Sequence, residues 1–277
     1  MISGVRPRQV LPDVQLFAAR TPTLPPATHT NSYAIGAREV VIVEPATPYE
    51  DERRAWVEWV RALPSQGRTP VAIVATHHHE DHVAGAAFLA RETDLPLLAH
   101  EATRARLDDS VQIARIVREG EILVDAWRVL HTPGHAPGHV CLHDEAGGAL
   151  VCGDMVASVG TILIAPGDGD MRVYLEQLAR LEGLGARVAL PAHGDPIDDP
   201  SALFRRYIEH RAMREGRIVD ALRAGPRAAS DLLPDAYADA PPHLWPIAAL
   251  SLQAHLDKLV VEGRAARDHE NVYRLLS

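Results

Sequence analysis

The chain has 277 residues, 47% of them hydrophobic, so it is long enough for one large domain and a smaller one. Its formal net charge of −9 argues against a general nucleic-acid coat protein. Two cysteines cannot build a disulfide framework, the N-terminal residues lack a secretory signal, and no apolar run approaches the roughly 18 residues that span a bilayer. These features predict a cytoplasmic protein without a membrane segment.

The first part of the chain alternates β-type segments with turns. Strands are predicted at residues 14–18, 31–35 and 40–43. Thr47 and Pro48 have the residue types of an N-cap and a first-turn proline, so we expect a helix to begin there.

A run of histidines and acids, Thr76-His77-His78-His79-Glu80-Asp81-His82, follows an apolar segment at 71–75 that predicts a buried strand. In an extended chain, residues i and i+2 lie on the same side. His77 and His79 can therefore meet one cation. Imidazole and carboxylate are ligands that Zn²⁺ and similar divalent ions accept, so the run predicts a metal site.

The last two residues of this run, Asp81 and His82, are expected to face away from His77 and His79. The apolar residues 83–89 predict a helix, which places Asp81 and His82 at its N-terminus, where they are free to serve a second cation. A solvated histidine cluster or a purification tag is the alternative, but the run lies inside the chain between a predicted strand and a predicted helix. A His-Glu-x-x-His zinc helix is excluded, because Val83 stands where its second histidine is needed.

The middle of the chain predicts two β/α halves in a layered α/β architecture, because strands precede and follow single helices. Residues 101–117 are helical or mixed, without clear boundaries. The predicted strands are 96–99, 126–130, 140–143, 149–152 and 188–190, with an amphipathic helix at 171–181.

The composition changes after Pro200, where helical patterns begin. The predicted helices are 203–215, 218–222, 230–237 and 244–261, and Gly216 leaves open whether the first two are continuous. A hairpin of 264–267 and 272–275 closes the chain. Helices followed by a β-hairpin are the order of a winged-helix module.

Three further segments place a histidine or an acid at the end of a predicted strand or in the loop that enters one. They are 130–139, which ends in His139, 150–154, which ends in Asp154, and 190–196, which contains His193. Taken singly each is weak, since an Asp after Gly is usual in turns and a lone histidine is usually solvated. Taken in this order with the histidine run, they are specific.

The combined pattern resembles that of the metallo-β-lactamase superfamily: a His-x-His-x-Asp-His loop, then a His, an Asp and a His at later strand ends. The resemblance covers residues 14–200 and implies an α/β class with a four-layer αββα fold, in a catalytic domain at 1–200. It implies two divalent metal ions, and Zn²⁺ is the expected metal. The implied ligands are His77, His79 and His139 for the first metal, Asp81, His82 and His193 for the second, and Asp154 as the bridge between them.

Other residues near these positions have supporting roles under the resemblance. The two other histidines of the 130–139 loop, His131 and His135, are expected to pack the loop or to support a ligand. His78 and Glu80 point away from the metals under the i, i+2 geometry and are expected to be structural. Glu44 stands where the family commonly has Asp, as a partner of a ligand.

The C-terminal residues 201–277 resemble the small winged-helix domain of the β-lactamase-like protein 2 group. The match lies in the His255-Leu256-Asp257-Lys258-Leu259 and Glu262-Gly263 segments. Known members of that group are associated with single-stranded RNA cleavage, whereas related fungal enzymes release acyl groups from carrier proteins. Glyoxalase II has the same ligand set but a different helical C-terminal region. No cysteine occupies a ligand position, unlike in lactamases that use one there, so antibiotic hydrolysis is not expected as the main role.

The resemblance implies a hydrolase in which a hydroxide shared by the two metals attacks the substrate. We expect Asp81, or else a bound water, to carry the proton, with Asp81 as the candidate catalytic residue. A thioester or ester substrate, presented as a small molecule or on an acyl carrier, is favoured because only 5% of the residues are aromatic and could stack on bases. Cleavage of single-stranded RNA is the alternative. Seven arginines within 201–228 could hold phosphates, but a solvated helix face with i, i+4 pairs such as Arg211–Glu215 is favoured.

Two other classes of function are weaker. A nucleic-acid-binding regulator with a vestigial metal site would need a basic reading helix, but Lys258 is the only cation between residues 244 and 261. An oxygen-using iron enzyme on the same scaffold would usually bind one metal, whereas here the second ligand set is complete. The sequence does not predict the oligomeric state.

Overall fold

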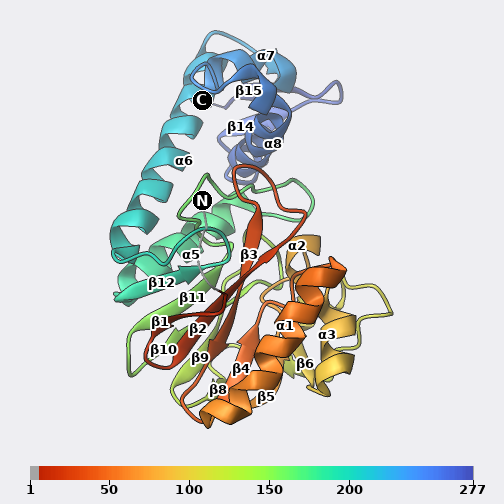
Figure 1. The fold of residues 1–277 in the computed structure, drawn as a ribbon. Helices are drawn as coiled ribbons and strands as arrows, with labels where there is room; N and C mark the ends of the chain where they lie inside the picture. Colours follow the sequence, from red (N-terminus) through yellow and green to blue (C-terminus); the bar gives the residue numbers. More distant parts are fainter. Residues whose placement is uncertain (1–5, 277) are drawn as a thin grey trace. The chain divides into compact units, whose positions relative to one another are not determined.

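The structure is a computed structural model that describes residues 6–276 (Figure 1). Its contacts divide these residues into two compact units. The first unit contains the residues up to 132 together with 137–161 and 185–200. The second contains 133–136, 162–184 and the residues from 201 onward. Within residues 6–276, no helix has both the length and the apolar character needed to cross a membrane.

The first unit contains a seven-stranded sheet in which the strands follow one another in chain order. Strands β1 to β4 pair antiparallel, and β4 to β7 pair parallel. Parallel neighbours need crossover connections, and helices supply them here. The strands are β1 (Arg8–Leu11), β2 (Val14–Arg20), β3 (His29–Ile35), β4 (Glu39–Val43), β5 (Thr69–Val74), β6 (Leu97–His100) and β7 (Arg115–Val117). The connecting helices are α1 (Glu50–Ala62), η1 (Leu63–Gln66), α2 (Glu80–Val83), α3 (Ala86–Thr93) and α4 (Glu101–Arg104).

A five-stranded sheet, in the order β12-β11-β10-β9-β8, completes the first unit. Its strands pair antiparallel except for β11 and β12, which run parallel. The strands are β8 (Ile122–Val124), β9 (Trp127–His131), β10 (Val140–Asp144), β11 (Ala149–Gly153) and β12 (Val188–Pro191). Helix α5 (Met171–Leu184), which belongs to the second unit, connects β11 to β12 in the chain.

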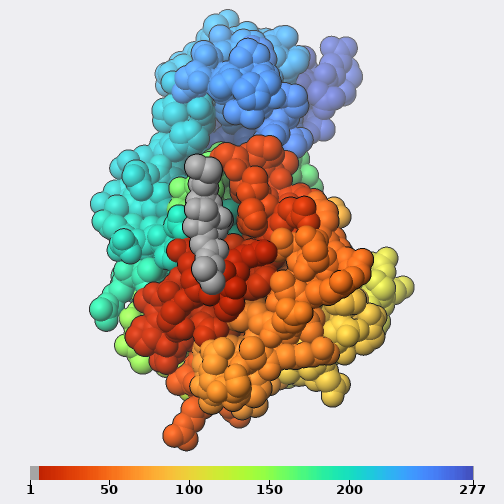
Figure 2. All heavy atoms as spheres, viewed as in Figure 1, coloured from red at the N-terminus to blue at the C-terminus, as the bar shows by residue number. Residues whose placement is uncertain are grey.

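Two apolar clusters hold the first unit together. One joins the two sheets, with Leu16 and Val74 from the larger sheet and Leu142 and Leu190 from the smaller. The other joins the opposite face of the larger sheet to α1 and α3, through residues such as Trp56. Figure 1 shows both helices along β4, β5 and β6, and residues 50–93, orange to yellow in Figure 2, form part of the surface. The larger sheet is therefore buried on both faces.

Two predicted helix boundaries are wrong. Helix α1 begins at Glu50 rather than at Thr47, and Tyr49 is its N-cap residue. The predicted helix at 83–89 is broken between α2 and α3 by Gly85. A Cβ on Gly85 would lie 2.5 Å from the carbonyl oxygen of Thr47, so a larger residue does not fit at this junction. Residues before α1 therefore pass against the α2–α3 junction instead of entering the helix early.

The second unit has the predicted order of helices followed by a hairpin. Helix α6 runs unbroken through Gly216, so the two predicted segments there are one helix. The short strand β13, which was not predicted, pairs with β15 and gives a three-stranded sheet in the order β13-β15-β14. The elements are α6 (Pro200–Arg223), β13 (Arg227–Ala228), α7 (Ala229–Ala236), η2 (Pro242–Leu244), α8 (Trp245–Val261), β14 (Ala265–Arg267) and β15 (Val272–Leu275).

A buried arginine closes the end of the larger sheet where β2 begins and β3 ends. The Arg68 side chain is 8% exposed and donates hydrogen bonds to the carbonyl oxygens of Gly36 at 2.7 Å, Asp13 at 2.9 Å and Ala34 at 3.1 Å. Because Arg68→Ala would remove a buried donor from all three carbonyls, we expect it to lower the free energy of unfolding by about 2–4 kcal/mol. Urea denaturation measures this loss. Arg54→Ala, which removes an exposed partner of Glu50 on α1, is the control and should leave the midpoint unchanged.

Candidate metal centre

The seven predicted ligands all belong to the first unit, and most follow the carboxyl end of a strand. His77 and His79 lie in the loop after β5, and Asp81 and His82 lie on α2. His139 immediately precedes β10, whereas Asp154 and His193 follow β11 and β12. β4 and β5 run parallel in one sheet, as do β11 and β12 in the other, so each pair ends at a single edge.

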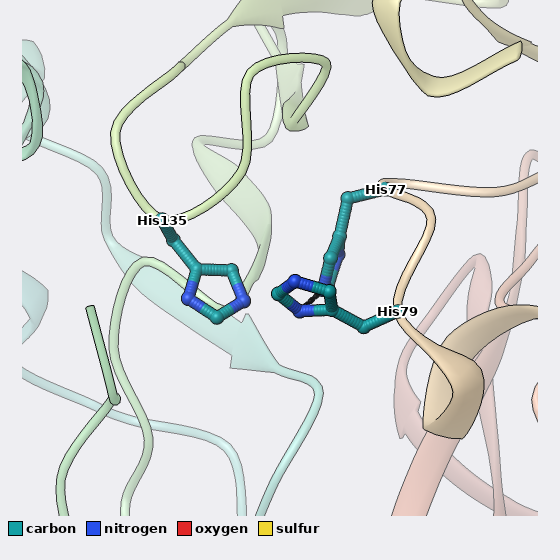
Figure 3. Close-up of side chains that lie close together, drawn as sticks. All are labelled: His77, His79 and His135. Atoms are coloured by element: carbon teal, nitrogen blue, oxygen red, sulfur yellow. Dashed lines mark hydrogen bonds between the residues drawn. The ribbon is translucent and has the colours of Figure 1, made fainter. Parts of the chain in front are cut away.

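The rings of His77 and His79 lie close together, with Nε2 of His77 3.0 Å from Nδ1 of His79. Figure 3 shows the two rings pointing toward one another from the loop after β5. The ring centroid of His139 lies 5.2 Å from that of His77. Nε2 of His139 accepts a hydrogen bond from the backbone N–H of Asp154 at 3.0 Å.

Asp81, His82 and His193 form a second group, with one ligand atom from each within 4.8 Å of the others. The Asp81 carboxylate lies 3.5 Å from Nε2 of His193 and 3.7 Å from Nε2 of His82. The Asp154 carboxylate also contacts both rings, at 3.4 Å from His193 and 3.5 Å from His82. The backbone N–H of Asp154 also contacts His139, so the residue has contacts in both groups.

Nδ1 of His77, His139 and His193 has a hydrogen-bonding contact, and Nδ1 of His82 lies at ion-pair distance from Glu44. Nε2 of each ring therefore faces the other predicted ligands. A ligating histidine usually has such a partner on its second nitrogen, so this arrangement suits metal binding. Of these partners only Glu44 was predicted from the sequence, because hydroxyls and a carbonyl carry no sequence signal of their own. The Nδ1 partners are Thr76 Oγ1 for His77 (3.0 Å), Glu44 Oε1 for His82 (3.1 Å), Thr132 Oγ1 for His139 (2.8 Å) and the His29 carbonyl oxygen for His193 (3.0 Å).

Opposite charges stabilise each other inside this cluster. Burial alone would lower the pKa of His82, but the carboxylates of Glu44, Asp81 and Asp154 raise it well above its usual value. Burial would raise the pKa of Asp154, but His193 and His82 hold it well below the usual range. The buried carboxylates therefore require positive charge beside them. A divalent cation held by neutral imidazoles would supply that charge, so the residues fit a metal site.

His131, His135 and Glu80 lie in the same segments as the predicted ligands but were expected to have supporting or structural roles. His131 stacks on His100 with ring centroids 4.0 Å apart, and its Nε2 lies 2.9 Å from the carbonyl oxygen of Pro137. His135, also drawn in Figure 3, belongs to the second unit, where its Nδ1 lies 2.9 Å from the Leu163 carbonyl oxygen. Glu80 is exposed in the first turn of α2.

A family model described as the metallo-beta-lactamase superfamily matches residues 25–193, which include all seven predicted ligands. The chain belongs to this superfamily. A second model, the beta-lactamase associated winged helix domain, matches residues 228–273 of this superfamily member. The family match, together with a relative that is named as a thioesterase, identifies the chain as a metal-dependent hydrolase.

Relatives of this hydrolase extend over most of its length. The beta-lactamase-like protein 2 homolog of Drosophila melanogaster is 29% identical over 255 residues, covering 85% of this chain and 83% of the relative. An atrochrysone carboxyl ACP thioesterase of Aspergillus chevalieri is 28% identical over 70% of this chain and 60% of its own. The crystal structure of a metallo-beta-lactamase family protein of Thermus thermophilus has a TM-score of 0.77 and 26% identity, covering 97% of this chain and 100% of that one. These matches confirm the predicted fold class with its C-terminal winged helix.

Proposed function

We propose that the chain is a dinuclear zinc hydrolase that cleaves a thioester or ester. His77, His79 and His139 would hold one cation, Asp81, His82 and His193 the other, and Asp154 would bridge them. The observation that carries this proposal is the buried cluster itself, in which imidazoles anchored through Nδ1 surround two carboxylates. We also propose that residues 1–200 act as the catalytic domain and that 201–277 form a separate winged-helix domain.

The cations, when bound, would activate a water molecule and polarise the scissile carbonyl. The residues of the chain would orient the ligands and move the proton. The side chain of Asp81 is 18% exposed, against 10% for Asp154, so its carboxylate has more access to solvent. We therefore assign to Asp81 the transfer of the proton from the attacking water to the leaving group.

An acyl substrate is favoured over RNA by the environment of the arginines in the second unit. Six of the seven arginines between residues 201 and 228 already contact a carboxylate or a carbonyl oxygen within that unit, so few charges remain for phosphates. The name of the Aspergillus relative, an acyl-carrier thioesterase, points to the same substrate class. The contacts are Arg205 to Glu182, Arg211 to the Ile162 carbonyl oxygen, Arg214 and Arg217 to Asp239, Arg223 to Asp220 and Arg227 to Asp235.

Parallel assays of the zinc-loaded protein on a thioester, an ester, a lactone and labelled single-stranded RNA test the substrate class. We expect turnover of the thioester or ester, reduced about 100-fold or more in Asp81→Ala. Cleavage of RNA that is lost in Asp81→Ala, with no turnover of acyl substrates, would instead establish the ribonuclease alternative.

Glu44 offers a test of the ligand assignment, because its buried carboxylate lies behind His82 and accepts a hydrogen bond from the Thr76 hydroxyl. Glu44→Gln removes the charge that favours a cation beside His82. We expect the affinity for zinc to fall by about 10–100-fold, measured by competition with a coloured chelator. Glu52→Gln, a buried carboxylate that pairs with Arg6 instead, is the matched control. Equal zinc affinity in both variants would count against His82 as a ligand.

A further inference from the structure

Strand β3 of the larger sheet holds the turn that carries His193 at the edge of the smaller sheet. That turn, residues 191–194, follows β12, which is an edge strand with β11 as its neighbour. Beside this neighbour, the backbone N–H of Ala192 donates to the Gly153 carbonyl oxygen of β11 at 3.1 Å, and the N–H of Ser158 donates to the His193 carbonyl oxygen at 3.2 Å. Further contacts come from outside the smaller sheet. Asn31 and Tyr33 supply them from β3, where the i, i+2 spacing places both side chains on the face toward the smaller sheet.

The hydrogen bonds from β3 reach three carbonyl oxygens of the turn. The Asn31 amide nitrogen Nδ2 donates to Pro191 at 2.9 Å and to Gly194 at 2.7 Å. The backbone N–H of Asn31 donates to Ala192 at 2.8 Å, and the Tyr33 hydroxyl donates to Pro191 at 2.7 Å. Asn31 and Tyr33 are 1% and 0% exposed, so water does not compete for these bonds.

The same strand also orients the imidazole. The carbonyl oxygen of His29, at the start of β3, lies 3.0 Å from Nδ1 of His193. A carbonyl oxygen only accepts, so Nδ1 carries the proton of that bond. Nε2 is then the nitrogen that faces Asp81 and Asp154. One strand thus fixes both the backbone that carries His193 and the nitrogen that the ring presents.

The choice of asparagine at position 31 is not explained by packing alone. Its carbonyl oxygen Oδ1 is buried and has no hydrogen-bond partner among residues 6–276. A buried acceptor without a partner is unfavourable, and an apolar side chain of similar size would avoid it. What asparagine supplies instead is a nitrogen that donates to two carbonyl oxygens of the turn at once.

We propose that Asn31 and Tyr33 are positioning residues that set the place of His193 as a ligand of the second cation. This inference rests on the proposed function, in which His193 holds that cation together with Asp81 and His82. The first cation, with His77, His79 and His139 as its ligands, has no ligand in this turn. Loss of the β3 contacts should therefore weaken one cation far more than the other.

Zinc titration of metal-free protein, with the two affinities measured separately, tests the proposal in Asn31→Leu and the milder Tyr33→Phe. We expect two equivalents in the wild type, and a second affinity that falls about 10–100-fold in Asn31→Leu and about tenfold in Tyr33→Phe, with the first nearly unchanged. The matched control is Thr21→Val, which removes the buried Thr21–Thr30 hydroxyl contact of 2.8 Å beside the same strand. It should change neither affinity.

A second measurement uses metal-free protein and does not depend on the proposed function. In the wild type and in Thr21→Val, the Nδ1 proton of His193 should give a slowly exchanging NMR signal, which Asn31→Leu should broaden or abolish. The proposal would be overturned if Tyr33→Phe lost stability but kept both zinc affinities and the Nδ1 proton signal of His193. Wild-type protein that binds no zinc would refute the proposed function, and the NMR signal would still decide whether β3 positions His193.

Discussion

Asp154→Asn is expected to lower the rate of acyl hydrolysis by about 1,000-fold or more. The Asp154 carboxylate lies 3.4–3.5 Å from Nε2 of both His193 and His82, and its amide contacts His139. Its carboxylate thus contacts two members of the second proposed ligand set, and its backbone N–H contacts one member of the first. A neutral amide cannot balance two cations, and a loss of several kcal/mol of charge stabilisation corresponds to this factor. Steady-state kinetics on a thioester, at saturating zinc, measures the effect.

Glu80→Gln is the matched control for that variant. Glu80 lies in the same histidine run and carries the same charge, but it is exposed in the first turn of α2. Its replacement should leave kcat within about twofold, since exposed charges outside the site contribute little. Similar losses in both variants would mean that the net charge near the site, and not the particular position of Asp154, governs the rate.

Glu215→Gln is expected to destabilise the second unit by about 2–4 kcal/mol at neutral pH. Glu215 on α6 is 9% exposed and bonds Lys258 on α8 at 2.7 Å and Arg264 before β14. Removing the charge leaves Lys258, itself largely buried, without its full counter-charge. The loss stays below that of a fully buried pair because Arg264 is half exposed. Urea denaturation, with hydrogen exchange in α8 to localise the effect, measures it.

The contribution of Glu215 should also depend on pH. Burial would raise the pKa of this carboxyl, but the neighbouring side chains of His255, Lys258 and Arg264 lower it from 4.5 to about 2. A depressed carboxyl pKa stabilises the fold above pH 4.5, and that stabilisation is lost as the pH falls toward 2. The difference between wild type and Glu215→Gln should therefore shrink over this range. Asp220→Asn, at an exposed pair with Arg223, should show no such difference at any pH.

The sequence predicted the elements that carry the proposed site because its signals there are local. The apolar run before His77 gave β5, the segment that ends in Asp154 gave β11, and that before His193 gave β12. Alternating or continuous apolar residues followed by a turn are enough to find a buried strand end. The superfamily pattern then follows from the order of these ends, which the family match supports.

What the sequence could not predict depends on contacts between distant residues. The short strands β1, β7, β8 and β13 have at most four residues each, too few to show a period. The predicted solvated helix face at Arg211 and Glu215 is wrong, since both residues are buried. Glu215 instead bonds α8 and the residue before β14, and Arg211 donates to the carbonyl oxygen of Ile162. Local spacing on α6 cannot reveal partners that tertiary packing supplies.

Hydrolysis by this chain is expected to depend on two cations held by this cluster. The most direct test is to remove metal with a chelator, return zinc in known amounts, and follow thioester hydrolysis with the metal content of the protein. We predict no activity in the metal-free protein and a rise that reaches its plateau at about two equivalents per chain. Undiminished hydrolysis by protein that contains no metal would show that the reaction does not depend on bound cations.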